Sequence, residues 1–155
     1  TLGKENLDYN YIQEDPRIRE QEWHGKIPEY YDEEISDQME NDCHMYGKFF
    51  YRFEGGESSA DVYNRVSDFI NSLHRDFENS DYPENVLIVS HGMAMRVFMH
   101  RWFKKSVYEF ETWSNPHNCK IWKLNLNSNH KYTFDFSTIP TKPVEHNFKC
   151  KLEIN

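Results

Sequence analysis

Residues 86–96 read VLIVSHGMAMR. A run of apolar, mostly β-branched residues ends just before Ser90 and His91, and a glycine follows. Short apolar runs bounded by glycine are typical of buried strands, so we predict a strand over residues 86–90. After the glycine, apolar positions recur at helical spacing up to about residue 103. His91 is therefore expected at the carboxyl end of a strand, beside the amino terminus of a helix.

This position of His91 is typical of a binding site. In open α/β sheets, ligands bind at the carboxyl ends of the strands. Free backbone N–H groups at the start of a helix favour anions, and phosphate above all. An imidazole at this place indicates phosphate chemistry. A histidine that only caps the helix is the alternative.

Further elements surround the predicted strand. Ser58 and Asp61 have the spacing of a capping box, and apolar residues then recur at helical intervals, so we predict a helix over residues 58–77. Helix, turn, strand and helix in this order make an α/β unit. Residues 120–126 and 131–136 alternate with period two and predict a β-hairpin.

Length and composition exclude several classes of function. A chain of 155 residues is long enough for one domain with a core. The net charge of -8 argues against nucleic acid as a partner, because binding a polyanion needs a basic surface. No apolar run approaches the roughly 20 residues of a membrane-spanning helix, so no membrane is expected. Cys43, Cys119 and Cys150 lack the spacing of a disulfide framework or zinc site, so we expect reduced thiols, a cytoplasmic location, no metal and no cofactor.

Three blocks in order along the chain point to a known family. Residues 15–25 read DPRIREQEWHG, residues 56–62 read GESSADV, and residues 90–92 read SHG. These blocks resemble those of the histidine phosphatase superfamily, the phosphoglycerate mutase-like enzymes. Residues 115–124 are similar to the family's closing strand. The resemblance covers about residues 1–136.

The resemblance implies a three-layer α/β/α phosphoglycerate mutase-like fold, in the α/β class, and a phosphohistidine mechanism. In the family, the histidine of an Arg-His-Gly motif on the first strand is the nucleophile. A glutamate is the general acid, and Glu20 matches it. A second histidine completes the phosphate pocket, and His91 matches it. Gly92 would let a phosphate approach the backbone, while Arg19 and Arg52 are candidates for phosphate or substrate binding, with a plain surface role as the alternative.

The sequence departs from the family pattern at its start. No Arg-His-Gly motif occurs in the 155 residues, and Thr1 falls near the place where that block should have ended. We therefore expect an incomplete phosphatase domain over residues 1–136, in which residues 26–56 form an insertion or lid over the site and residues 29–45 are helical. Residues 137–155 are expected to be a carboxyl-terminal tail on the surface. The chain alone is expected to be inactive and to leave an unpaired sheet edge.

The predicted activity is hydrolysis of small phosphomonoesters through a phosphohistidine, with a small phosphorylated substrate or inorganic phosphate as the ligand. A homodimer is a candidate assembly. Residues 21–25 are short and lack the glycines of the family's mutases, which favours a phosphatase over a phosphoglycerate mutase. A non-catalytic binding or regulatory module is the third possibility, because the Arg-His-Gly motif is missing. The substrate itself does not follow from these residues.

Overall fold

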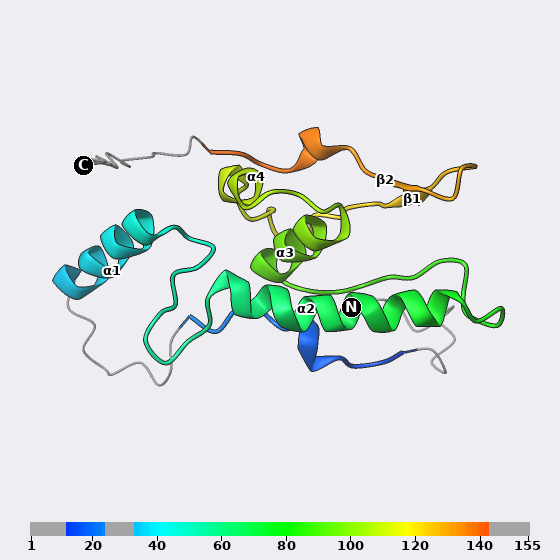
Figure 1. Cartoon of the computed structure of the whole chain (residues 1–155), viewed down its shortest axis with the longest axis horizontal. Coiled ribbons are helices and arrows are strands. Elements are labelled where there is room, and N and C mark those ends of the chain that lie inside the picture. The colour runs from blue at the N-terminus through cyan, green and yellow to red at the C-terminus, as the bar shows by residue number, and fades with distance from the viewer. Residues whose placement is uncertain (1–11, 24–32, 143–155) are drawn as a thin grey trace, which may run out of the picture.

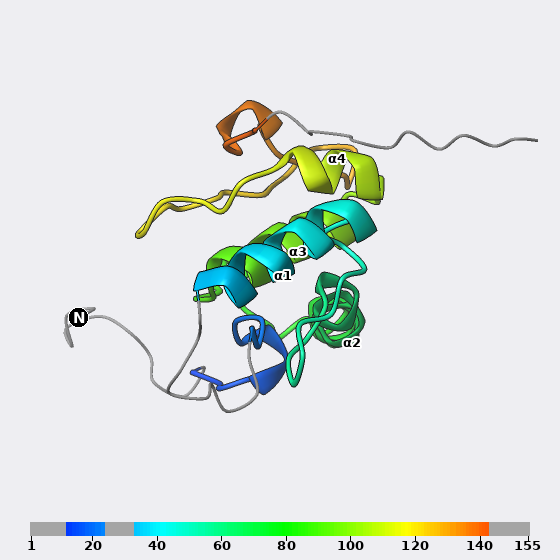
Figure 2. The same cartoon turned by 90° about the vertical axis from the view of Figure 1, so that its left-hand side faces the viewer.

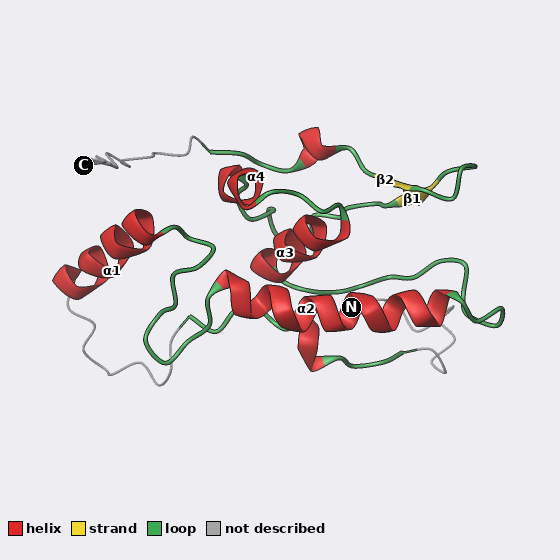
Figure 3. Ribbon diagram, in the orientation of Figure 1, coloured by secondary structure: helices red, strands yellow, loops and turns green. Residues whose placement is uncertain are grey.

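The computed structural model describes residues 12–23 and 33–142, and helices dominate this part of the chain (Figure 1). The helical elements are η2 (Pro16–Ile18, a 3-10 turn), α1 (Glu33–Tyr46), α2 (Ser59–Phe77), α3 (Gly92–Trp102), α4 (Val107–Thr112) and η3 (Phe136–Thr138, a 3-10 turn). The strands β1 (Asn125–Leu126) and β2 (Tyr132–Thr133) pair antiparallel, with Asn125 opposite Thr133. Figure 3 shows how small this sheet is beside the helices. Helices α2, α3 and α4 stack in this order (Figure 2).

Helix α2 confirms its prediction from the sequence. The hydroxyl oxygen of Ser58 accepts a hydrogen bond from the N–H of Asp61 at 3.2 Å, and the Asp61 carboxylate accepts one from the N–H of Ser58 at 2.7 Å. This reciprocal capping box fixes the start of the helix. The apolar stripe of the helix is buried and comprises Val62, Val66, Ile70 and Leu73.

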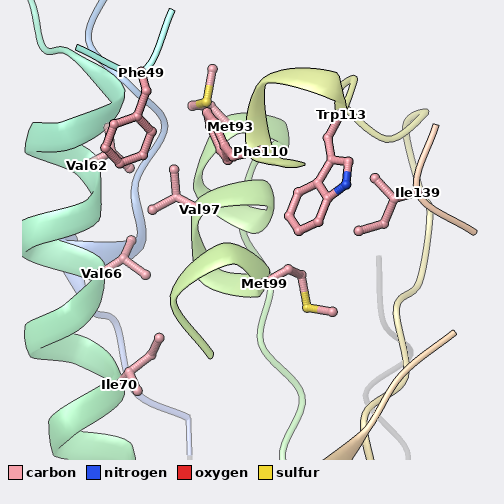
Figure 4. Close-up of a cluster of buried hydrophobic side chains, with 10 residues drawn as sticks. All are labelled: Phe49, Val62, Val66, Ile70, Met93, Val97, Met99, Phe110, Trp113 and Ile139. Carbon is pink, nitrogen blue, oxygen red and sulfur yellow. The ribbon is translucent and has the colours of Figure 1, made fainter. Parts of the chain in front are cut away.

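Helix α3 begins at Gly92, as the sequence predicts, and packs against α2. Apolar side chains of both helices meet in the core with residues from α4 and the loops around it (Figure 4). The fully or nearly buried members of this core are Phe49, Val62, Val66, Ile70, Met93, Val97, Met99, Phe110, Trp113 and Ile139. The core therefore holds the start of α3, and with it His91, in a fixed position.

Residues 86–90 do not form the predicted strand. The segment runs without regular secondary structure, and residues 84–90 make no backbone–backbone hydrogen bond with any residue that the structure describes. A strand needs the hydrogen-bond ladder of a neighbour, and no neighbour is placed beside this segment in the described ranges. Leu87 and Val89 are 66% and 76% exposed. The apolar run therefore leads into α3 without a sheet around it.

Residues 137–142 differ from the expected surface tail. Ile139 is only 3% exposed and belongs to the core. The N–H of Ser114 donates to the carbonyl oxygen of Pro140 at 2.6 Å, so the chain returns here to the end of α4. The rest of the expected tail, residues 143–155, lies outside the described residues.

The hairpin and the helix expected around residues 29–45 are confirmed in part, while an insertion or lid over the site at residues 26–56 stays a prediction. The hairpin forms, but regular pairing is limited to β1 and β2. Helix α1 lies within the predicted helical insertion, whose first residues lie outside the described ranges. Helix α4 was not predicted, although Ser106 and Glu109 form a capping box at its start. None of the helices in the described ranges is long and apolar enough to cross a membrane.

Candidate active site

The carboxylate of Glu20 lies at the amino terminus of α3. One of its oxygens accepts a hydrogen bond from the N–H of Gln21 at 2.9 Å, and the other accepts one from the N–H of Met93 at 3.4 Å. Met93 is the second residue of α3, at the end of the helix dipole that favours anions. The fold thus brings Glu20 to the helix end that the sequence predicts to bind phosphate, across 73 positions of the chain.

His91 lies at the same helix end, and its side chain is exposed. Its backbone carbonyl accepts a hydrogen bond from the N–H of Met95 at 2.8 Å, but its imidazole makes no capping bond. The geometry therefore does not support the capping alternative. The hydroxyl of the preceding Ser90 donates to the carbonyl oxygen of Ile18 at 2.7 Å. This bond connects the residue before His91 to residues 17–22, which we call the Glu20 loop.

A buried cation lies behind this helix end. A Cβ atom at Gly92 would stand 3.0 Å from Cγ of Asn115, so the glycine allows close packing of these two residues. The amide oxygen of Asn115 accepts a hydrogen bond from Nη1 of Arg96 at 3.0 Å. Arg96 is 7% exposed, and burial lowers its pKa to about 10 against the opposing effects of Glu20 and Glu111. Arg96 is therefore charged at neutral pH and adds to the pull on an anion.

Arg19 and Arg52, the two predicted substrate-binding arginines, are paired with carboxylates. Nη2 of Arg19 donates to Glu57 at 2.9 Å, and Nη1 lies 3.5 Å from the carboxylate of Glu22. Nη2 of Arg52 donates to Asp61 at 2.5 Å, at the start of α2. Both arginine side chains are exposed. A phosphate would have to compete with these carboxylates, and the binding role of the two arginines stays a prediction.

Glu20, His91 and Gly92 line a groove of about 1380 Å³. Residues 84–90 and 117–124 form much of its wall. This volume exceeds the roughly 300–1,000 Å³ of a typical small-molecule pocket. The groove therefore has room for a further protein segment beside a small phosphorylated ligand.

Two residues that hold the Glu20 loop were missed or misassigned from the sequence. Arg65 of α2 and the carboxylate of Glu57 both bind this loop. An acidic residue beside the start of a helix, such as Glu57, is typical of helix capping, and a charged residue on an amphipathic helix, such as Arg65, also fits a solvated face, so the sequence pattern does not indicate these contacts. No cluster of histidine, cysteine and acidic side chains suited to a metal ion occurs within residues 12–23 and 33–142.

Comparison with known sequences identifies a protein family and several similar proteins. A sequence model of the histidine phosphatase superfamily (branch 1) matches residues 4–136. "Phosphoglycerate mutase-like protein AT74H" of Arabidopsis thaliana is 40% identical over 129 residues, which cover 79% of this chain and 44% of that protein. "Broad-range acid phosphatase DET1" of Saccharomyces cerevisiae is 38% identical over 127 residues, 80% of this chain and 36% of that protein. The chain thus spans less than half the length of both relatives. No solved structure matches it.

Proposed function

The chain belongs to the histidine phosphatase superfamily, and we therefore propose that the complete protein hydrolyses small phosphomonoesters. By the complete protein we mean the natural polypeptide that contains these 155 residues. The observation that carries the proposal is the carboxylate of Glu20 at the amino terminus of α3, next to His91. Hydrolysis of a phosphomonoester needs a proton donor for the leaving group and hydrogen-bond donors for the phosphoryl oxygens. These two residues would supply both.

The proposed reaction has two steps. In the first, a histidine nitrogen of an Arg-His-Gly block attacks phosphorus, the bond from phosphorus to the leaving oxygen breaks, and the Glu20 carboxyl group gives that oxygen its proton. In the second, water attacks phosphorus while the Glu20 carboxylate takes its proton, the phosphorus–nitrogen bond breaks, and inorganic phosphate leaves. His91 and the backbone N–H groups at the start of α3 donate to the phosphoryl oxygens throughout.

The groove beside His91 supports a place for the missing nucleophile. Residues 84–90 and 121–123 both lack backbone–backbone hydrogen bonds to other described residues. We place the strand with the Arg-His-Gly block between these two segments, because it would supply hydrogen-bond partners for both. Its histidine would then reach the phosphate at the carboxyl end of the strand, where ligands bind in α/β sheets.

Two alternatives rest on specific observations. Two related proteins from Arabidopsis thaliana are named phosphoglycerate mutase-like. This name favours transfer of the phosphoryl group to a second hydroxyl group instead of to water. The 155 residues contain no Arg-His-Gly motif, which favours a binding or regulatory module without catalysis.

The test separates these three functions with one substrate labelled on its phosphate. The complete protein is mixed with the labelled phosphomonoester, and the reaction is stopped in alkali, in which phosphohistidine is stable. We expect transient label on the protein and release of inorganic phosphate at the rate of turnover. Label that passes to an added hydroxyl acceptor instead of water identifies a mutase. The absence of both labelling and turnover would identify a binding module and refute the proposal.

A further inference from the structure

We propose that Arg65 is a positioning residue that fixes the Glu20 loop, so that the carboxyl group reaches the leaving oxygen. The inference deepens the proposed function and rests on it, since it concerns the acid of that reaction. Arg65 lies on α2, and its side chain is 15% exposed.

The guanidinium of Arg65 binds three backbone carbonyl groups of the loop. Nη1 donates to the carbonyl oxygens of Arg17 at 2.7 Å and Arg19 at 2.8 Å. Nη2 donates to the carbonyl oxygen of Glu20 at 3.0 Å. One side chain of α2 thus holds the backbone on which Glu20 stands, from 45 positions further along the chain.

Glu57 completes this attachment. Nε and Nη2 of Arg65 donate to its two carboxylate oxygens, both at 3.0 Å, and the N–H of Glu22 donates to one of them at 3.0 Å. Burial raises the pKa of the Glu57 carboxyl group, but hydrogen bonds from Arg65 and Glu22 outweigh burial, and the net pKa lies below its ordinary value of 4.5. The Glu57 carboxyl group is therefore charged at neutral pH. The loop is held on both sides of Glu20.

These contacts leave Arg65 no free donor for a substrate. A guanidinium has five N–H groups, and the bonds to Arg17, Arg19, Glu20 and the two oxygens of Glu57 use all of them. A phosphate would also meet a cation that is already neutralised by Glu57. Arg65 therefore acts through the loop and not by contact with the phosphate.

The carboxylate of Glu20 depends on this support. Its bond to the N–H of Met93, at 3.4 Å, is longer than a strong N–H···O bond. The position of the carboxylate therefore depends on the loop itself, through the 2.9 Å bond from the N–H of Gln21 and the backbone that Arg65 holds, more than on this long contact. Arg65→Lys keeps the charge but loses the fork of donors, because one ammonium cannot reach three carbonyls and a carboxylate at once.

The experiment compares two substrates that differ in their need for an acid. An alkyl phosphate releases an alkoxide, which needs a proton, whereas p-nitrophenyl phosphate releases a nitrophenolate, which does not. We measure kcat/KM for both substrates with the complete protein, because kcat/KM reports only the steps up to departure of the leaving group. The matched control is Arg75→Lys on the same helix, since Arg75 is exposed and its Nη2 donates to the hydroxyl of Ser72 at 3.0 Å.

Arg65→Lys should lower kcat/KM for the alkyl phosphate by about 10- to 100-fold, since a displacement of about 1 Å can cost a catalytic group up to about 100-fold, and should spare p-nitrophenyl phosphate to within about threefold. Arg75→Lys should change neither. In a protein that already carries Glu20→Gln, Arg65→Lys should have no further effect on the alkyl substrate, because the group that it positions is gone. This double-mutant cycle separates positioning of Glu20 from general loss of structure.

Equal losses on both substrates, or a full further loss in the Glu20→Gln background, would overturn the inference. Absence of turnover in the wild-type protein would instead overturn the proposed function. If Arg65→Lys does not fold, as judged by its thermal transition, Glu57→Gln decides, since it weakens the same attachment at nearly unchanged volume. The same loss confined to the alkyl substrate is expected of that variant, and a uniform loss again overturns the inference.

Discussion

Replacement of His91 separates a role in the reaction from a role in helix capping. His91 is the N-cap residue of α3, with an extended backbone (φ -119°, ψ 167°), but its imidazole makes no capping hydrogen bond. His91→Ala therefore removes no capping bond from the helix. Because the side chain is also exposed, we expect the free energy of unfolding to change by less than about 0.5 kcal/mol.

His91→Asn is the matched variant. Asparagine is among the preferred N-cap residues, and its side-chain oxygen can accept a hydrogen bond from the N–H of Met93 or Ala94, the second and third residues of α3. This variant should gain about 0.5–1 kcal/mol of stability, which raises Tm by about 1–4 °C for a domain of this size. Both variants lose the imidazole as a donor to the phosphoryl oxygens, and in His91→Asn the capping bond turns the shorter amide toward the helix. The loss of such a donor typically lowers the rate on the order of 10²–10³-fold.

The assay combines steady-state turnover of a phosphomonoester with urea and thermal unfolding of the complete protein. The expected result is two variants of which only His91→Asn is more stable than wild type, and both of which have low activity. Activity of His91→Ala within about fivefold of wild type would refute contact between His91 and the phosphoryl group. A drop of several degrees in the Tm of His91→Ala would show instead that the imidazole stabilises α3.

Three further predictions concern Glu20, Gly56 and His100. Glu20→Gln should slow an alkyl phosphate by about 10²–10⁴-fold but spare the initial burst of nitrophenol from p-nitrophenyl phosphate; stopped-flow absorbance measures the burst, and equal slowing of both substrates would exclude Glu20 as the acid. Gly56→Ala should cost about 1–3 kcal/mol in urea unfolding, because its Cβ would stand 2.5 Å from the carbonyl oxygen of Glu22; an unchanged midpoint would contradict this contact. Burial lowers the pKa of the His100 imidazole from its ordinary 6.5. The stability that the neutral imidazole contributes is therefore fully present above about pH 6.5 and is lost as the pH falls from there through the lowered pKa. His100→Phe should therefore lose less stability than wild type between about pH 7 and pH 5.5, and equal pH slopes in urea unfolding would contradict the argument.

Helices α2 and α3 could be predicted because their signals are local. The capping box of Ser58 and Asp61 and the apolar repeat after it determine α2 within its own sequence. The glycine and the apolar positions that follow it do the same for α3. The predicted start of α3 at Gly92 also places His91 directly before the helix.

Other parts of the fold depend on partners that local patterns do not reveal. Residues 86–90 have the composition of a buried strand, but a strand exists only beside another strand, and the described chain places none there. Ile139 is a single apolar residue close to prolines, without periodicity, so its burial in the core left no signal in the sequence.

The candidate site shows the same division. Family resemblance identified Glu20 and His91, and their catalytic roles stay predictions. Their common location became visible only through contacts such as that of Ser90 with Ile18, which joins positions 72 residues apart. The role of Arg65 could not be predicted, because its guanidinium binds backbone carbonyl groups of a distant loop. Every residue has such a carbonyl group, so the sequence does not indicate which ones are bound.

The unpaired segment at residues 84–90 has a consequence for handling the chain in isolation. Val86, Leu87 and Val89 are exposed, and the backbone groups of the segment make no backbone hydrogen bonds to described residues, as at the edge of a sheet to which a strand of another molecule can pair. Residues 86–89 are uncharged, contain no proline and have high β-propensity, which are also the features of aggregation-prone segments. In concentrated solution, copies of this chain would pair with one another through this segment. Its yield and shelf life would then follow self-association at this segment, and not the stability of the helices.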